Sequence, residues 1–210
     1  KKIVSNNSDG LIAKIKYFFK KFPKIYFFLA YLLGGRQVNT TAQKFVNNLE
    51  KGLVIVNIGS GTKSLREDVI NIDFFPFPIV DVIAKVEELP FKDSSVDVVV
   101  CDNVLEHVKD PKKVVAEIKR VLKLEGLVYM GVPFVIQYHS SPNDFYRWTH
   151  EGVRELMSDF DEIELKIACG PTSAMTTILS EWLAIVLSFN IEFLYNLFII
   201  FFTILFAPLR

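Results

Sequence analysis

Short apolar runs separated by polar turns fill the middle of the chain. The runs are rich in valine and isoleucine, which is typical of strands buried on both faces of a parallel sheet. Residues 111–122 instead repeat apolar positions at intervals of three and four, which predicts a helix with one buried face. The pattern predicts strands at residues 53–58, 69–72, 80–84, 96–101, 127–132 and 163–168.

Helix signals lie between these strands. Asp110 followed by Pro111 is a cap with proline in the first turn, and Thr149 caps another helix. Residues 41–51 read as a short helix, and residues 61–69 leave room for only about two helical turns. Strands that alternate with helices predict an α/β protein with a Rossmann-like, doubly wound, mostly parallel sheet.

Both ends of the chain are apolar in a different way. Residues 17–33 interleave aromatic residues with lysines, and their uninterrupted apolar part is shorter than the roughly 20 residues of a membrane-spanning helix. We expect an interfacial amphipathic helix there, with a helix packed on the protein's own core as the alternative. Residues 177–187 and 191–207 read as two helices split near residues 188–190. A membrane-embedded hairpin or an interfacial pair is expected, and a lid over the substrate cavity is the alternative.

These patterns divide the chain into a helical arm at residues 1–40, an α/β domain at 41–170 and a hydrophobic helical tail at 171–210. The chain has 24 basic and 24 acidic residues, but residues 1–36 hold eight of the basic residues and one acid. A basic arm on an acidic body indicates an anionic partner. A membrane surface is favoured over nucleic acid, because the body carries no basic stripe.

The cysteines and histidines form no recognisable set. Two cysteines, Cys101 and Cys169, make no disulfide framework, and three histidines lack the spacing of a zinc site, so no metal site is expected. This cysteine usage is typical of a reduced, intracellular protein. The expected location is the cytoplasm, and a peripheral or anchored position at the inner face of a membrane stays open.

The most informative stretch runs from Leu53 to Asp73. Its first apolar run ends in Gly59-Ser60-Gly61, where glycines allow a positive φ and a close approach of the backbone to a ligand. Its second run ends at Asp73, and a carboxylate at the tip of a second parallel strand can accept hydrogen bonds from both hydroxyls of a ribose. The combination indicates a cofactor that contains a nucleoside. Ser64 stands where the dinucleotide pattern has its third glycine, which disfavours a nucleotide-dependent oxidoreductase.

Six motifs follow one another along the chain. They are Gly59-Ser60-Gly61, Asp73, Glu88-Leu89-Pro90-Phe91, Asp97 inside a valine-rich strand, Leu105-Glu106-His107-Val108 and Glu117-Ile118-Lys119-Arg120-Val121-Leu122-Lys123. In this order they resemble the class I S-adenosylmethionine-dependent methyltransferases, in particular the methyltransferase type 11 family. The resemblance implies that family's fold, in which a seventh, antiparallel strand ends the sheet; no candidate for that strand remains in this sequence.

The resemblance implies S-adenosyl-L-methionine as the cofactor and assigns roles by position. The glycine turn would pass under the amino-acid part of the cofactor, Asp73 would hold the ribose, and the segment around Val86 would border the adenine. Lys85 stands where the family often has an aspartate, so either the backbone alone or Glu87 would meet the adenine. The implied cofactor-binding residues are Gly59, Ser60, Gly61, Asp73, Phe74, Val86, Glu87, Leu89, Asp102, Asn103 and Val104.

The loop after the strand at 127–132 should face the acceptor, because ligands of open α/β sheets bind beyond the carboxyl ends of the strands. Residues 134–148 combine aromatic, acid/base and cationic side chains. His139 is the first candidate for a general base, and His107, expected near the sulfonium, is the second. Arg147 is a candidate clamp for a phosphate or carboxylate. The expected substrate-binding residues are Tyr138, Asp144, Tyr146 and Arg147.

Together these features predict an S-adenosylmethionine-dependent methyltransferase that acts on a small-molecule or lipid-linked acceptor at a membrane surface. A degenerate relative that binds no cofactor and serves as an interaction module is the main alternative, motivated by Lys85 and by the short segment after Gly61.

Overall fold

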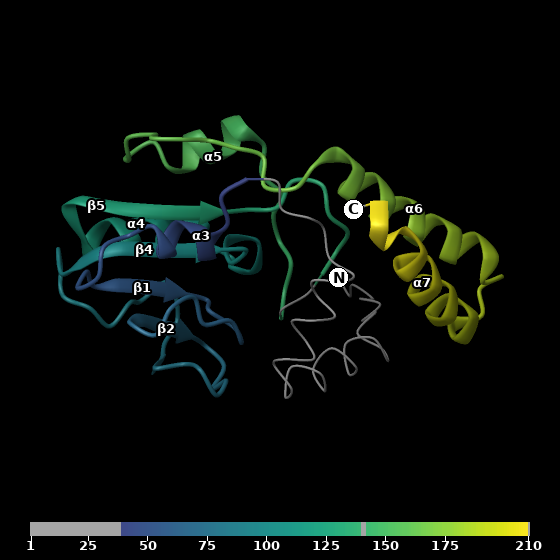
Figure 1. The fold of residues 1–210 in the computed structure, drawn as a ribbon, viewed down its shortest axis with the longest axis horizontal. Helices are drawn as coiled ribbons and strands as arrows, with labels where there is room; N and C mark the ends of the chain where they lie inside the picture. The colour runs from purple at the N-terminus through teal and green to yellow at the C-terminus, as the bar shows by residue number, and fades with distance from the viewer. Residues whose placement is uncertain (1–38, 140–141, 210) are drawn as a thin grey trace, which may run out of the picture. The chain divides into compact units, whose positions relative to one another are not determined.

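The computed structural model describes residues 39–139 and 142–209 (Figure 1). The chain divides into two compact units, one of them Gln37–Cys169 and the other including Gly170–Arg210. Apart from Asn39 and Thr40, the predicted arm at residues 1–40 lies outside the described residues. The predicted division into arm, α/β domain and tail stays a prediction.

A five-stranded parallel sheet forms the centre of the unit Gln37–Cys169 (Figure 1). Its order is β3-β2-β1-β4-β5, so the chain winds outward from β1 in one direction and then returns to β4 on the other side. Such a reversal opens a crevice at the carboxyl ends of the two central strands, which is where open α/β sheets bind ligands. The strands are β1 (Ile55–Ile58), β2 (Val69–Asp73), β3 (Val82–Ile83), β4 (Val96–Asp102) and β5 (Leu122–Gly131).

One helix covers each face of the sheet. Helix α4 (Pro111–Val121) packs its apolar stripe on the face of β1 and β4 that carries Val56 and Val99. Helix α3 (Ala42–Asn47) packs on the opposite face, against Ile55. Alternate residues of the apolar strands therefore serve two cores, as expected of strands in a doubly wound sheet. The Rossmann-like fold predicted from the sequence is confirmed.

The predicted caps are in place. Thr41 Oγ1 accepts a hydrogen bond from the backbone N–H of Lys44 at 3.1 Å, at the start of α3. Asp110 caps α4 in the same way, and Thr149 caps α5 (His150–Leu156). These bonds satisfy N–H groups that a helix start leaves without a partner.

A pair of buried amides joins the two strands that lead to the crevice. Asn57 on β1 and Asn71 on β2 are register partners, and each is about one-twentieth exposed or less. Asn57 Nδ2 donates to Asn71 Oδ1 at 3.1 Å. The backbone N–H of Asn71 donates in turn to Asp81 Oδ2 at 2.8 Å.

Two elements expected from the sequence do not form. The predicted strand at residues 163–168 is irregular, and Ile163 and Ile167 are 82% and 55% exposed, so the apolar pattern there buries no face. No helix forms between Gly61 and Val69, where about two helical turns are expected; this segment consists of non-helical turns and irregular backbone. Arg66 in this segment donates to the carbonyls of Val46 and Leu49, so the segment serves to close the end of α3.

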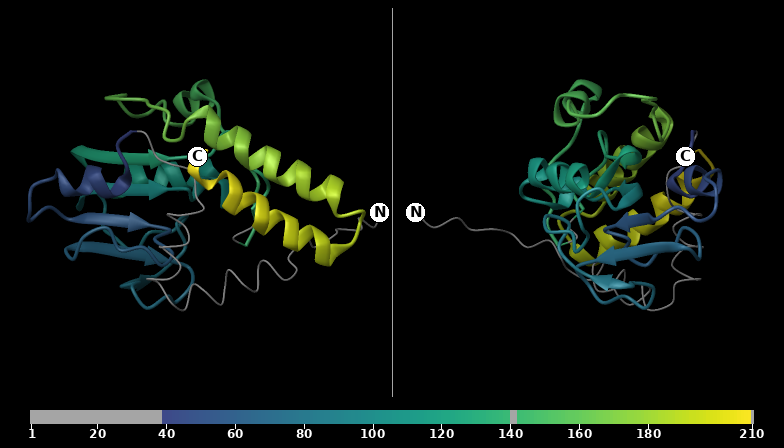
Figure 2. Two further views of the ribbon diagram at one scale, coloured as in Figure 1. Left: turned by 45° about the vertical axis from the view of Figure 1, so that its right-hand side comes forward. Right: turned by 90° about the vertical axis from the view of Figure 1, so that its left-hand side faces the viewer.

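Helices α6 (Pro171–Leu187) and α7 (Glu192–Phe206) lie side by side, and the short turn η2 (Ala207–Leu209) follows (Figures 1 and 2). The predicted split between two helices is confirmed, because Phe189 and Asn190 adopt positive φ values of 48° and 62°. Tyr195 of α7 donates its hydroxyl to Glu181 of α6 at 2.6 Å.

Candidate functional site

The glycine turn stands at the carboxyl end of β1. Gly59 and Gly61 have φ values of 63° and 57°, in the left-handed region that favours glycine. A Cβ on Gly59 would lie 2.5 Å from Cγ2 of Val104, whereas a Cβ on Gly61 would meet nothing within 4 Å. Gly59 therefore lets the turn pack on the segment after β4, and Gly61 keeps a surface open beside it.

Asp73 ties the end of β2 to this turn. Its Oδ2 accepts the backbone N–H of Gly61, and its Oδ1 accepts that of Phe75, each at 2.8 Å. Each carboxylate oxygen retains a further lone pair for a ligand hydroxyl. The hydroxyl of Ser60 is buried and has no hydrogen-bond partner in the part of the chain that the structure describes. The structure thus brings together the predicted glycine turn and acid, with a free polar atom between them.

Side chains of α4 bind the backbone of the segment around Val86 and Leu89, which would border the adenine. Val86 and Leu89 are buried in the main core, so they offer little side-chain surface. Glu117 Oε2 accepts the backbone N–H of Leu89, and Arg120 Nη2 donates to the Leu89 carbonyl, each at 2.9 Å. Glu117 and Arg120 belong to the last quoted motif, and their task of fixing this segment was not predicted.

The residues after β4 also join two strand ends. The backbone N–H of Asn103 donates to the Gly131 carbonyl at 2.9 Å, and its side chain donates to Asp102 Oδ1. Asn103 itself has a φ of 57°, and a Cβ on Gly131 would lie 2.2 Å from Asp102 Oδ1. Burial raises the pKa of Asp102, and the charge of Glu106 acts in the same direction.

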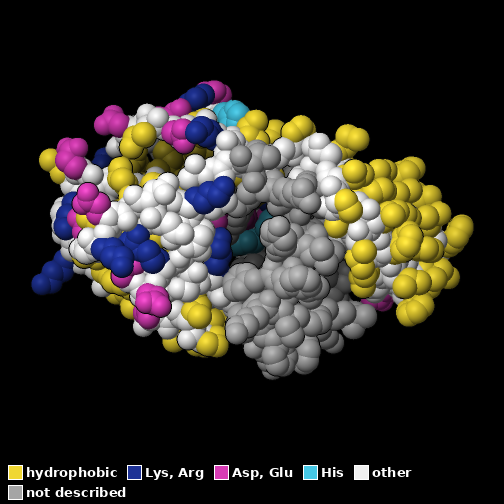
Figure 3. Space-filling model, in the orientation of Figure 1, with side chains coloured by type: hydrophobic (Ala, Val, Ile, Leu, Met, Phe, Trp, Pro, Cys, Tyr) yellow, Lys and Arg dark blue, Asp and Glu magenta, His cyan; other side chains and the backbone are white. Residues whose placement is uncertain are grey.

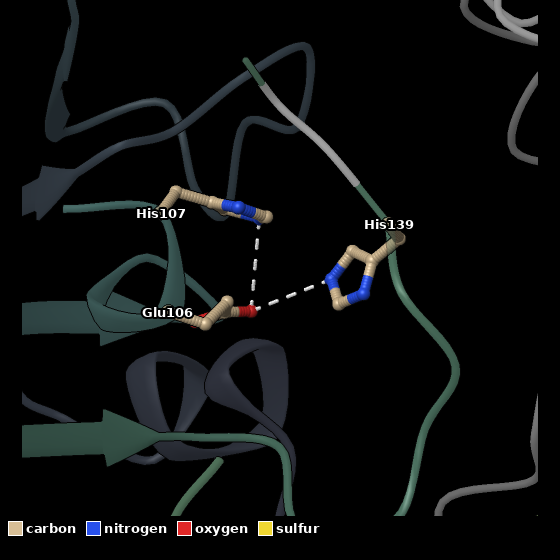
Figure 4. Close-up of side chains that lie close together, drawn as sticks. All are labelled: Glu106, His107 and His139. Carbon is tan, nitrogen blue, oxygen red and sulfur yellow. Dashed lines mark ion pairs between the residues drawn. The ribbon is translucent and has the colours of Figure 1, made fainter. Parts of the chain in front are cut away.

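A cluster of three side chains forms at the turn η1 (Leu105–His107), which supplies Glu106 and His107, while His139 comes from the loop after β5 (Figure 4). Glu106 is fully buried, and neither of its carboxylate oxygens has a hydrogen-bond partner among the described residues. Nε2 of His107 and Nε2 of His139 each lie 3.7 Å from Glu106 Oε1. The fold therefore unites the two predicted catalytic histidines around a carboxylate that the prediction did not include.

Backbone carbonyls orient both imidazoles. His107 Nδ1 lies 2.6 Å from the Asn143 carbonyl, and His139 Nδ1 lies 3.2 Å from the Gln137 carbonyl. Because a carbonyl only accepts, Nδ1 carries the proton in both rings, and Nε2 faces Glu106. The pKa of His139 is raised, mainly by its interaction with Glu106.

An internal ion pair shapes the loop that carries His139. The Asp144 side chain is 2% exposed and accepts Nη2 of Arg147 at 2.7 Å and the backbone N–H of His139 at 2.8 Å. Arg147 lowers the pKa of Asp144 to about 2. Arg147 also donates to the carbonyls of Ile136 and Gln137. The guanidinium that resembled an acceptor clamp is thus engaged within the loop, and its substrate role stays a prediction.

The remaining predicted acceptor residues differ in their surroundings. Tyr138 is 64% exposed, whereas the Tyr146 hydroxyl donates to the Lys109 carbonyl at 3.0 Å. The backbone N–H of Phe145 donates to the Glu106 carbonyl at 2.7 Å, which fastens the loop to η1. A weak signal for Glu106 existed in the sequence, since this glutamate directly follows the apolar residues Val104 and Leu105 and stands two residues before Val108.

Comparison with known proteins identifies the core of this unit. Residues 56–130 match the sequence model of a family described as "Methyltransferase domain". The match covers 75 of the 210 residues of the chain, about a third. The resemblance predicted from the motifs is confirmed, and the matched stretch runs from β1 into β5 of the methyltransferase domain.

Relatives share short, well-matched segments with this domain. An uncharacterized protein of Methanocaldococcus jannaschii is 47% identical over 51 residues, 24% of this chain and 25% of that protein. A probable S-adenosylmethionine-dependent methyltransferase of Mycobacterium tuberculosis is 45% identical over 58 residues, 27% of this chain and 21% of that protein. The matched segments thus span about a quarter or less of the length of these curated relatives.

A solved structure extends the likeness to the fold. The crystal structure of a Thermotoga maritima protein, titled an S-adenosylmethionine-dependent methyltransferase and possible histamine N-methyltransferase, superposes with a TM-score of 0.50. The two sequences are 20% identical, and the match covers 68% of this chain and 79% of that one. The fold of the methyltransferase domain is therefore that of class I methyltransferases.

Proposed function

We propose that this protein is an S-adenosylmethionine-dependent methyltransferase. The observation that carries the proposal is the bond between Asp73 and the Gly61 N–H, which joins a ribose-type acid to the glycine turn at the sheet's crevice. The residues fit the cofactor: Gly61 leaves open space, Ser60 has a free buried hydroxyl, and Asp73 retains lone pairs. When bound, the cofactor supplies an activated methyl group on sulfur.

In this proposal the protein acts chiefly by alignment. Gly59, Ser60 and Gly61 hold one end of the cofactor, Asp73 holds the ribose, and Asp102 to Val104 line the side toward η1. Holding two reactants in line can lower a barrier by about 7–11 kcal/mol. Acceptor activation falls to the cluster of Glu106, His107 and His139, in which His139 comes from the loop expected to face the acceptor (Figure 4).

Calorimetry with S-adenosylhomocysteine tests the cofactor assignment. Asp73→Asn removes the charge that would accept two ribose hydroxyls, so we expect about ten- to hundred-fold weaker binding. Asp81→Asn is the matched control, because Asp81 also accepts a backbone N–H beside β2 but lies away from the glycine turn. Equal affinity of the Asp73 variant and the wild type would remove the proposal.

A second candidate is an interaction module that has lost cofactor binding. Two observations favour it: Lys85 stands at the adenine position, and the segment after Gly61 forms turns instead of the helix whose N-terminus usually serves the ligand. The same titration separates the candidates, because a degenerate module gives no heat with S-adenosylhomocysteine at millimolar concentration.

We also infer that the methyl acceptor is amphiphilic and that the protein binds it at a membrane surface. Segment Glu192–Leu209 is 18 residues long with a mean hydropathy of 1.9, is long and apolar enough to cross a membrane, and is 6% buried. Figure 3 shows hydrophobic side chains gathered over α6 and α7. At 1.5 Å per residue the segment is about 27 Å long, close to the roughly 30 Å hydrocarbon core of a bilayer.

The burial pattern of α6 supports this location. Small and polar residues are buried, whereas large apolar ones such as Trp182 (57%) and Met175 (68%) are exposed. The hydroxyls of Thr176 and Ser180 donate to backbone carbonyls one turn earlier, so these two groups need no water. Small residues inside and apolar residues outside are typical of helices that pack in lipid. The buried residues of α6 are Ser173, Thr176, Ser180 and Ala184.

A further inference from the structure

The Glu106 carboxylate needs a counter-charge. It is fully buried, and neither of its oxygens has a hydrogen-bond partner among residues 39–139 and 142–209. An isolated charge in such a place costs several kcal/mol, so buried carboxylates are normally paired, hydrogen-bonded or bound to a metal. Its nearest ionisable neighbours are the two imidazoles, and each stands at 3.7 Å, beyond the roughly 2.7–2.9 Å of a charged hydrogen bond.

The two histidines present the same nitrogen to this carboxylate. Each ring donates its Nδ1 proton to a backbone carbonyl and turns Nε2 toward Glu106 Oε1. The neutral form of such a ring has a lone pair on Nε2, and two lone pairs facing a carboxylate repel unless a proton or a metal cation lies between them. Metal-binding histidines show this arrangement, with one nitrogen on the metal and the other bonded to a carbonyl or carboxylate.

The spacing suits a small cation. The three ligand atoms lie within 4.8 Å of one another, and both histidine–glutamate separations are 3.7 Å. Bonds of about 2.0–2.2 Å in a tetrahedral site place ligand atoms roughly 3.3–3.6 Å apart. The two histidine–glutamate separations therefore need to close by only a few tenths of an ångström, and the histidine–histidine separation, which is within 4.8 Å, by up to about 1.5 Å.

We propose that Glu106, His107 and His139 bind a divalent transition-metal ion, with Zn²⁺ as the reference ion. Two imidazoles and one carboxylate are a ligand set that such ions accept, and three protein ligands leave a coordination position open. The inference rests on the proposed function for its purpose: an acceptor oxygen bound at the open position gives up its proton to solvent more readily. The histidines then act as ligands, and no separate general base is needed.

Metal binding by the full-length protein tests this inference. Protein stripped with a chelator is titrated with Zn²⁺ by calorimetry, and the bound metal is counted by elemental analysis. We expect one ion per chain. His107→Ala and His139→Ala should each weaken binding more than tenfold, since each removes a ligand. His150→Ala is the matched control, because His150 is exposed and lies outside the cluster.

Co²⁺ in place of Zn²⁺ provides a second readout, because its visible absorption reports nitrogen and oxygen ligands in a site of low coordination. Glu106→Gln should lose this band, and the metal-free variant should unfold at the same temperature as the wild type or higher, since a buried charge is removed. Should the wild type bind Zn²⁺ no better than the His107 and His139 variants, the imidazoles only pair with Glu106 and the inference is wrong.

Failure of the inference and failure of the proposed function are distinguishable. S-adenosylhomocysteine is titrated into the same preparations with and without Zn²⁺. Cofactor binding without specific metal binding removes the inference and leaves the methyltransferase proposal. Specific metal binding without cofactor binding leaves the metal site in a protein that is not a methyltransferase.

Discussion

Replacing Gly59 by alanine probes how the glycine turn meets the segment after β4. Alanine in the left-handed region costs about 1–2 kcal/mol. The added Cβ would also lie 2.5 Å from Cγ2 and 2.9 Å from Cγ1 of Val104, and overpacking of this kind costs about 1–3 kcal/mol. We therefore expect Gly59→Ala to destabilise the methyltransferase domain by about 2–5 kcal/mol, a large share of the 5–15 kcal/mol typical of a domain.

Gly61 is the matched comparison within the same turn. Its φ of 57° is nearly that of Gly59, but a Cβ there meets nothing within 4 Å. Gly61→Ala should therefore cost only the backbone part, about 1–2 kcal/mol. It should weaken S-adenosylhomocysteine binding instead, because the methyl group occupies the open surface beside the turn.

A double-mutant cycle isolates the packing part. Val104→Ala removes both methyl groups that the new Cβ would meet, so the double variant should recover about 1–3 kcal/mol relative to the sum of the single variants. Urea unfolding followed by circular dichroism measures all four proteins. If Gly59→Ala were no more destabilising than Gly61→Ala, or if the cycle showed no coupling, the close approach of the turn to Val104 would be refuted.

Three further outcomes follow from the structure. Arg120 holds the pKa of Glu117 below its ordinary value near 4.5. The pair therefore stabilises the fold fully above about pH 4.5 and loses that stabilisation as the pH falls. In urea titrations, the free energy of unfolding of Glu117→Gln should decrease less between pH 6 and pH 3 than that of the wild type. Arg147→Gln should lower Zn²⁺ affinity roughly tenfold or more, because Arg147 and its carboxylate partner hold the His139 backbone; unchanged affinity would show that the loop orders itself. Ile200→Asp should reduce co-sedimentation of the full chain with phospholipid vesicles, whereas Ile163→Asp, at an exposed position of the irregular segment before α6, should not.

Local patterns predicted most of the methyltransferase domain. Strands β1 and β4 are visible as apolar runs, and Thr41, Asp110 and Thr149 mark helix starts, because each signal depends on neighbours a few residues away. The predicted strand at 163–168 is wrong, because strand formation depends on distant parts of the chain as well as on near neighbours. A strand needs a partner edge and a face to bury, and an apolar pattern specifies neither.

Some residues of the candidate site could be predicted from the sequence, and others could not. Asp73 and the glycine turn could be predicted, since the order of parallel strands places their ends together. Glu106 could not be predicted as the centre of a cluster, because its burial and the approach of His139, which lies 33 residues further along the chain, depend on how the loop folds back on η1. From the sequence, Arg147 is a candidate clamp for the acceptor, because a sequence does not show which groups within the protein a guanidinium binds. In the fold, this guanidinium donates to the backbone carbonyls of Ile136 and Gln137 in its own loop.

The amide pair of Asn57 and Asn71 has a consequence for how length changes are tolerated. Parallel strands of valine and isoleucine could slide past one another with little loss of apolar contact, but a slip by one residue would separate the two amides and take from the buried Asn71 Oδ1 the donor that Asn57 provides. The pair thus fixes the register of β1 and β2, so that the carboxyl ends of the two strands stay side by side. Insertions into the irregular connection at 62–68 should leave that alignment intact, whereas one inserted residue inside either strand should separate Gly61 from Asp73.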